Sequence, residues 1–176
     1  MYPQVAGSTP ASLTMPVSPR TQKPLLVGEQ NPYGGDSYYA LYPSPEGCSG
    51  DRLCRLVLGM HRSVYLEVFD RTNLCDGPWV ASDARRRAVE IVSESRSKIV
   101  LLGSKVCRAF GVVYHPFERF SRYLVLPHPS GLCRLWNEPG AFQRARDCVA
   151  LLAPHLYDHL GAIYASVPEA AIRGEG

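Results

Sequence analysis

The stretch Leu124-Val-Leu-Pro-His-Pro-Ser-Gly-Leu-Cys-Arg134 decides the fold that we expect for this chain. It begins as an apolar run typical of a buried strand and continues into a proline-rich loop carrying a histidine, a serine and a leucine. A second stretch, Leu25-Leu-Val-Gly-Glu-Gln-Asn-Pro-Tyr-Gly-Gly35, has the same construction. Because open α/β sheets bind ligands at the carboxyl ends of their parallel strands, the two loops predict a single site at one edge of a sheet.

Strand patterns alternate with helical patterns along the rest of the chain. This alternation indicates an α/β fold, a three-layer α/β/α domain with a short central parallel sheet of about four strands. The expected strands are 23–27, 64–69 with its continuation 70–74, 98–102 and 122–126. Ser49 is expected to cap a first helix, and Ser82 or Asp83 a second with Ala88, Val89 and Val92 on its apolar face.

The chain length of 176 residues suits one domain with a substantial core. We expect a disordered Pro/Ser/Thr-rich tail over 1–23, a single domain over 24–168 and a flexible carboxyl terminus over 169–176. The last helix of that domain, over 142–163, should be kinked or split at Pro154.

Composition excludes several classes of protein. No apolar stretch approaches the roughly 18 to 20 residues that span a bilayer, so no membrane partner is expected. None of the 6 cysteines forms a Cys-x-x-Cys pair, so no zinc ribbon or redox motif is indicated and neither metal nor cofactor is expected. Cys107 and Cys148 lie in apolar helical patterns, which favours reduced thiols in an intracellular protein. The net charge of +3 is compatible with a polyanion partner, although the run Arg85–Arg87 is typical of a solvated helix face.

Three segments resemble motifs of the uracil-DNA glycosylase superfamily. Glu29-Gln-Asn-Pro-Tyr33 is similar to its first motif, written GQDPYH in one branch and G-x-NPG in the mismatch-specific branch. His128-Pro-Ser-Gly-Leu-Cys-Arg134 resembles a hybrid of the second motif, HPSPL in one branch and NPSGLSR in another. Thr72-Asn73 resembles the position from which an asparagine reads the uracil edge. The matches follow the family's order and approximate spacing, and they span most of the chain.

The resemblance implies a uracil-DNA glycosylase-like fold and a monofunctional enzyme of base excision repair. Such an enzyme flips uracil, or a related modified pyrimidine, out of DNA and hydrolyses its bond to deoxyribose. The implied partner is DNA containing such a base, and the implied state is a monomer. One branch carries an iron–sulfur cluster, but this chain lacks that branch's Cys-x-x-Cys pair. No lysine lies in the matched motifs, which argues against a Schiff-base lyase mechanism.

His128 is the expected catalytic donor. Hydrolysis of an N-glycosidic bond places negative charge on the departing base, and each preorganised donor to such a charge contributes about 3 to 4 kcal/mol. Pro127 and Pro129 restrict the backbone on both sides of the imidazole. The alternative is a histidine with a purely structural role.

Asn31 and Glu29 are the two candidates for handling the attacking water. One branch of the superfamily carries a water-activating aspartate where this chain has Asn31. An amide cannot act as a general base, but it can orient a water through hydrogen bonds. Another branch places Gly-Glu at this point, which makes Glu29 a candidate acid or base. The alternative for Glu29 is a carboxylate that faces solvent or pairs with an arginine.

The resemblance also implies a set of base-binding residues. Gln30 belongs to the first motif, and Tyr33 resembles the tyrosine that excludes the methyl group of thymine. Tyr42 is expected to stack on the base, which contributes about 1 to 3 kcal/mol, with Tyr38 or Tyr39 as alternatives. Asn73 would read the base edge, because its amide offers both a donor and an acceptor, although a turn-forming asparagine is common after a strand.

DNA contacts are expected from the second loop. Leu132 lies where the family inserts an apolar wedge into the duplex, and Ser130 and Arg134 are suited to phosphate contacts.

Two other functions stay open. A nonhydrolytic nucleic-acid-binding relative would fit the missing aspartate, and an enzyme acting on 5-substituted pyrimidines in modified viral DNA would fit the looser wall at Gly34-Gly35.

Overall fold

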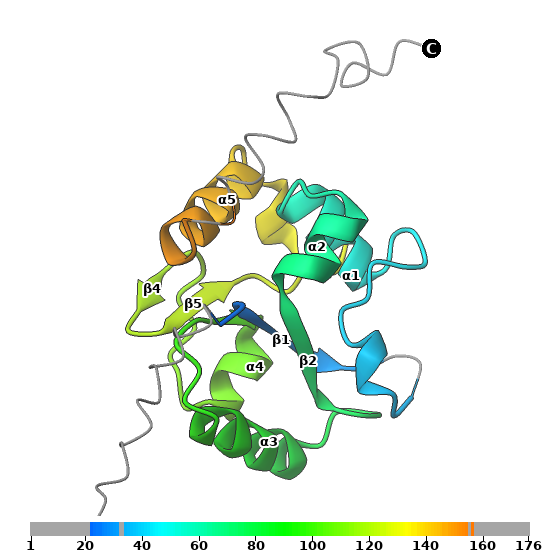
Figure 1. Cartoon of the computed structure of the whole chain (residues 1–176), viewed down its shortest axis with the longest axis vertical. Helices are drawn as coiled ribbons and strands as arrows, with labels where there is room; N and C mark the ends of the chain where they lie inside the picture. Colours follow the sequence, from blue (N-terminus) through cyan, green and yellow to red (C-terminus); the bar gives the residue numbers. More distant parts are fainter. Residues whose placement is uncertain (1–21, 32–33, 155, 157–176) are drawn as a thin grey trace, which may run out of the picture.

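The structure, a computed structural model, describes residues 22–31, 34–154 and 156. Its centre is a 5-stranded sheet with the strand order β2-β1-β3-β5-β4 (Figure 1). All neighbouring strands pair in parallel except β4, which is antiparallel to β5 at one edge. The strands are β1 (Leu25–Gln30), β2 (Asp70–Cys75), β3 (Ile99–Leu102), β4 (Arg119–Phe120) and β5 (Tyr123–Leu126).

Helices cover both faces of this sheet, as Figure 1 shows. One face packs against α1 (Ser49–Asp51), its π-helical continuation η2 (Arg52–Val57), α2 (Arg62–Val68) and α5 (Ala141–Leu152). The other face packs against α3 (Ala81–Ser93) and α4 (Ser104–Ala109). Two 3-10 turns, η1 (Ser37–Tyr39) and η3 (Arg134–Asn137), lie in the loops after β1 and β5. The expected α/β class is therefore confirmed, but the sheet has five strands rather than about four, and its edge strand β4 is antiparallel.

The middle strand β3 is buried along its whole length, as the apolar run 98–102 predicts. Its side chains alternate between the two faces of the sheet. Val100 and Leu102 belong to the core under α2 and α5, whereas Ile99 and Leu101 belong to the core under α3 and α4. The parallel register of β3 with β1 and β5 brings the loops after these strands to the same edge.

The expectation of a strand over 64–69 is wrong, because this segment forms most of α2. The His61 side chain accepts a backbone hydrogen bond at the start of the helix. Tyr65 and Phe69, four residues apart, are both buried in the core, and this helical packing overrides the β-propensity of the valines. The strand is the following segment, β2, which the sequence analysis had taken as a mere continuation.

Two helix starts also differ from expectation. Cys48 rather than Ser49 caps the first helix, because its Sγ accepts a backbone hydrogen bond over 3.4 Å. Val80 precedes α3, so neither Ser82 nor Asp83 is its N-cap. The first helical residue thus lies within one or two positions of the polar residues that signalled it.

The buried face of α3 differs from the expected one. Ala88 is buried as predicted, but Val89 and Val92 are exposed. The side chains that α3 buries are those of Ala84, Ala88 and Ile91. Their spacing of three or four residues fits one helical face, which the two exposed valines do not share.

The carboxyl-terminal helix α5 ends at Leu152, so the break expected at Pro154 is confirmed. Residue 155 and residues 157–163 of the helix predicted over 142–163, the tail up to residue 21 and the terminus over 169–176 lie outside the described residues. In the part of the chain that the structure covers, no helix combines the length and apolar character needed to cross a membrane.

Candidate functional site

The carboxyl ends of β1, β2 and β5 and the turn after β3 surround a pocket of about 240 Å³. Six residues singled out from the sequence line it, namely Glu29, Gln30, Tyr39, Tyr42, Asn73 and His128. The other lining residues are Leu41, Cys48, Ser49, Gly50 and Lys105. Loops from distant parts of the chain therefore meet at one edge of the sheet.

Asn73 presents a buried oxygen that lacks a partner. The residue lies in the edge strand β2 beside Gly28 of β1, and only 7% of its surface is exposed. Its Oδ1 is buried without a hydrogen-bond partner. An ideal Cβ on residue 28 would lie 2.2 Å from this oxygen, so a glycine is needed to accommodate the amide. Because an unsatisfied buried acceptor costs about 1 to 3 kcal/mol, this oxygen is suited to a ligand N–H group.

The loop after β5 holds the His128 imidazole in one orientation. The backbone N–H of Ser130 donates to His128 Nδ1 over 3.2 Å. Trp136 Nε1 donates to the His128 carbonyl over 2.8 Å, and Arg52 Nε donates to the Pro129 carbonyl over 3.0 Å. Because Nδ1 accepts a hydrogen bond, the neutral ring carries its proton on Nε2. The ring can therefore offer an Nε2–H donor to a ligand.

Burial lowers the pKa of His128 below its ordinary value. The Glu29 carboxylate opposes this shift and the Lys105 ammonium adds to it. The imidazole is therefore neutral at neutral pH, since a buried cation is disfavoured. A neutral ring can donate from Nε2 while it still accepts the Ser130 hydrogen bond at Nδ1.

Glu29 and Lys105 form an ion pair at the pocket wall, with 3.1 Å between Oε2 and Nζ. Lys105 Nζ also lies 5.6 Å from the centroid of the Trp79 ring. The close approach of Glu29 and His128 depends on Gly103, whose φ is 95°. An ideal Cβ there would meet His128 Cβ at 3.0 Å and Glu29 Oε1 at 3.4 Å.

Tyr42 lines the pocket from the long loop after β1. Arg62 donates a hydrogen bond of 2.7 Å to its hydroxyl, which lowers the pKa of the phenol, and lies 4.8 Å from the ring centroid. The preceding residue, Leu41, has a φ of 49°, a backbone conformation rarely adopted by leucine. The Tyr65 hydroxyl donates to the Leu41 carbonyl over 2.9 Å and holds this bend in place. Gly50 packs so closely on the Tyr42 carbonyl that any side chain there would clash.

Asn31 does not line the pocket that contains His128. Its side-chain amide donates to the carbonyls of Gly34 and Asp36, the latter over 2.9 Å. These bonds brace the loop that follows β1. Asn31 instead borders an adjoining hollow, which it shares with Gln30.

The other predicted contact residues lie elsewhere. Tyr33 falls outside the described residues. Ser130, Leu132 and Arg134 follow His128 on the same loop but do not line the pocket. Leu132 is 92% exposed, as a side chain available to an external partner would be.

Lys105, which follows the turn after β3, was not expected at the site. It lies outside the matched motifs, whose lack of a lysine argues against lyase chemistry, yet it lines the pocket. The signal that could have found it is the apolar run 98–102, because a strand in the middle of the sheet brings the turn that follows it to the same edge as the other two loops. The start of α1 at Cys48 carried no comparable signal.

No family model, curated protein or solved structure matches the chain. Among the residues that the structure describes, no group of three or more histidine, cysteine, aspartate or glutamate side chains is arranged to hold a metal ion.

Proposed function

We propose that this chain is a DNA glycosylase that flips uracil, or a related modified pyrimidine, and hydrolyses its bond to deoxyribose. One observation carries the proposal. A buried acceptor without a partner, Asn73 Oδ1, and a histidine fixed as an Nε2–H donor line the same small pocket. Such a pair complements a pyrimidine that has both an N–H group and carbonyl oxygens on its edge.

Asn73 would recognise the base. Its bare Oδ1 is suited to the N3–H of uracil, and its amide nitrogen to the neighbouring O4. Cytosine has no hydrogen at N3, so it would leave Oδ1 unsatisfied in that position. Sites that hydrogen-bond a substrate group discriminate strongly against analogues lacking it.

His128 would stabilise the departing base. As the glycosidic bond breaks, negative charge develops on the base and a neutral Nε2–H donates to its oxygen. The lowered pKa supports this role because it keeps the ring neutral, and the Ser130 hydrogen bond supports it because it favours the tautomer with a proton on Nε2. A donor placed in advance against a developing anion contributes about 3 to 4 kcal/mol.

Glu29 would position and activate the water, with Lys105 holding its carboxylate. Asn31 is the weaker candidate for this role because its amide donates to two carbonyls of its own loop. Among the residues that the structure describes, Glu29 is also the only acidic one that lines the pocket. A carboxylate can accept the proton of the attacking water, which an amide cannot.

The Glu29–Lys105 ion pair also favours one competing function. If the carboxylate stays bound to the ammonium throughout, the pocket would hold a base without hydrolysing its bond. The chain would then be a nonhydrolytic nucleic-acid-binding relative. An enzyme for 5-substituted pyrimidines in modified viral DNA remains a variant of the leading proposal, because the same chemistry would apply.

A substrate panel tests the proposal. Oligonucleotides that each contain one uracil, cytosine, thymine, 5-hydroxymethyluracil or other 5-substituted pyrimidine are incubated with the chain, as single strands and as duplexes, and then cleaved with alkali. We expect cleavage at uracil or at a 5-substituted relative with an N3–H, and none at cytosine. Binding without cleavage on every substrate would favour the nonhydrolytic relative.

A further inference from the structure

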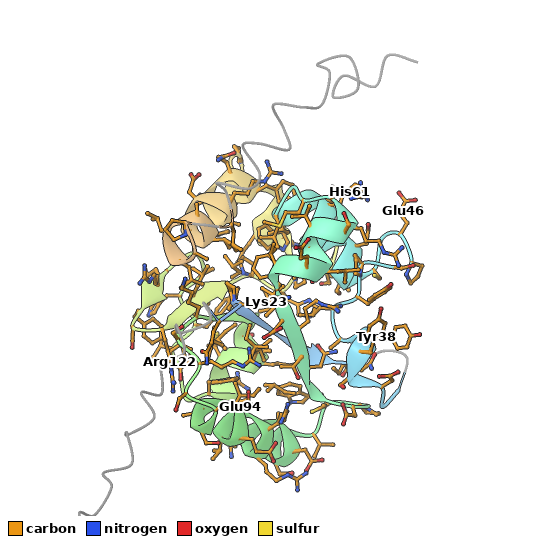
Figure 2. The ribbon with its side chains drawn as sticks, viewed as in Figure 1. Lys23, Tyr38, Glu46, His61, Glu94 and Arg122 are labelled. Atoms are coloured by element: carbon orange, nitrogen blue, oxygen red, sulfur yellow. The ribbon has the colours of Figure 1, made fainter. Side chains whose placement is uncertain are left out.

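Three tyrosines form an exposed aromatic surface beside the pocket. Tyr38, Tyr39 and Tyr42 pack with ring centroids 5.2 to 5.7 Å apart, and we call this group the tyrosine platform. Tyr38 is 57% exposed and Tyr39 is 46% exposed. Figure 2 shows Tyr38, which belongs to η1, at the edge of the molecule. Tyr39 and Tyr42 also line the pocket, so the platform continues the pocket wall onto the surface.

The backbone under the platform is held in place. Asp36 accepts a hydrogen bond from the Tyr38 backbone N–H over 2.9 Å, which caps η1. Arg71 donates to the Ala40 carbonyl over 3.1 Å. Fixed aromatic rings lose little conformational entropy when a ligand stacks on them.

Two arginines give the platform a positive charge. The guanidinium carbons of Arg62 and Arg71 lie 4.8 and 5.6 Å from the centroid of the Tyr42 ring. Arg62 is exposed and can also reach a phosphate. Aromatic rings interleaved with arginines are the combination that binds unpaired nucleotides, because bases stack on the rings and the backbone contacts the cations.

From this continuity we infer that the tyrosine platform stacks the unpaired nucleotide next to the one in the pocket, and that the chain therefore prefers single-stranded DNA. The inference rests on the proposed function for the occupant of the pocket. In a duplex the neighbouring base stays paired and stacked, so it cannot lie on Tyr38 or Tyr39. A single strand offers that base without the cost of opening a helix.

Binding of oligonucleotides that lack any target base tests the platform separately from catalysis. Fluorescence anisotropy compares a labelled single strand of deoxyadenosines with a strand of equal length whose sugars carry no bases. The wild-type chain should bind the first more tightly than the second. Tyr38→Ala should weaken binding of the first by about 5- to 100-fold, as stacking energies predict, and leave the second unchanged.

Matched variants separate stacking from other effects. Tyr38→Phe should keep wild-type affinity, whereas Tyr38→Leu, which retains apolar surface, should behave as Tyr38→Ala. Phe120→Ala removes a ring that is 41% exposed on β4, at the opposite edge of the sheet from β2, and should change nothing. Because Tyr38 is mostly exposed, its variants should melt at the wild-type temperature.

Three outcomes would overturn the inference. They are wild-type affinity in Tyr38→Ala, equal losses on the strands with and without bases, and equal affinity of the wild-type chain for a single strand and its duplex. Failure of the proposed function would give a different result from failure of this inference. In that case no base is released from any substrate, while the base-dependent binding of single strands persists.

Discussion

Asn73 Oδ1 occupies the space above Gly28 that any larger residue would fill, since an ideal Cβ on residue 28 would come within 2.2 Å of it. The two residues are neighbours in the register of β1 and β2. The glycine therefore matters for the position of one polar side chain at the pocket. This relationship links β1 through the sheet to the amide that we propose reads the base.

Gly28→Ala should displace the Asn73 amide and impair recognition of the base. The clashing atom is the end of a side chain, so the fold should survive while the amide moves. We expect kcat/KM to fall about 10- to 100-fold, the effect of losing one good base-edge contact. Asn73→Ala should cost a similar factor.

A double-mutant cycle checks the coupling of these two residues. Because Gly28→Ala would act through Asn73, the double variant should be no worse than either single variant. Losses that multiply would show that the two residues act independently, which contradicts the geometric account.

The pH dependence of activity should follow His128. Its pKa lies below the ordinary value, and protonation at Nδ1 would break the Ser130 hydrogen bond. We expect kcat/KM to be constant near neutral pH and to fall as pH drops through that lowered pKa, below about 6.5. The same fall of kcat/KM at low pH should persist in His115→Gln, which replaces an exposed histidine. If the fall disappears in that variant, its assignment to His128 is contradicted.

Titration of His128 should also make the fold less stable as pH drops. In the unfolded chain His128 binds its proton at about pH 6.5, whereas the folded chain binds it only at lower pH. The unfolded state thus holds more protons between the two pKa values, so the free energy of unfolding falls as pH drops through this window. Urea denaturation at several pH values should show this fall in unfolding free energy for the wild-type chain but not for His128→Gln.

Glu29→Gln should lower kcat far more than it changes KM. The substitution preserves shape but removes the group that accepts a proton, and loss of a general base typically costs about 100- to 10,000-fold. Glu67→Gln, an exposed position on α2, is the matched control. Steady-state kinetics of base release measures both variants. Wild-type kcat in Glu29→Gln would remove Glu29 from the chemistry.

Asn31→Ala should behave differently from Glu29→Gln. It removes the bonds from the amide to the Gly34 and Asp36 carbonyls, which brace the loop. We expect a loss of about 1 kcal/mol in unfolding free energy for each bond removed and a smaller loss of kcat than in Glu29→Gln. The reverse order of kcat losses would assign the water to Asn31.

Borohydride reduction should trap no covalent complex between the chain and DNA carrying a preformed abasic site. Lys105 is the lysine that lines the pocket, and its ammonium pairs with Glu29. An amine must lose its proton before it can attack the sugar. A trapped adduct that disappears in Lys105→Met would show lyase activity and contradict a purely hydrolytic mechanism.

The buried strands β1, β3 and β5 could be predicted from apolar patterning, whereas the strand order and the short edge strand β4 were not predicted. The runs 98–102 and 122–126 are continuous and lead directly into glycine or proline, so they could hardly form anything but buried strands. The segment 64–69 was misread because its valines have β-propensity, while the packing of Tyr65 and Phe69 that decides for a helix is a tertiary effect.

The residues of the site that belong to recognisable motifs were predictable from the sequence. Glu29 and Asn73 lie near the carboxyl ends of β1 and β2, His128 follows β5, and topology then brings them together. The orientation of Asn31 was not predictable, because the chain leaves the sheet after Gln30 and strand alternation no longer applies. Lys105 belongs to no motif and reaches the pocket only because β3 lies between β1 and β5.

The central claim is that a base bound between Asn73 and His128 is cut from its sugar, and mass spectrometry of the released base tests it most directly. Uracil-containing DNA, or DNA with a 5-substituted relative, should yield the free base with the wild-type chain. His128→Ala should yield it at least about 100-fold more slowly. Absence of any free base from all these substrates, or an undiminished rate in His128→Ala, would contradict the account.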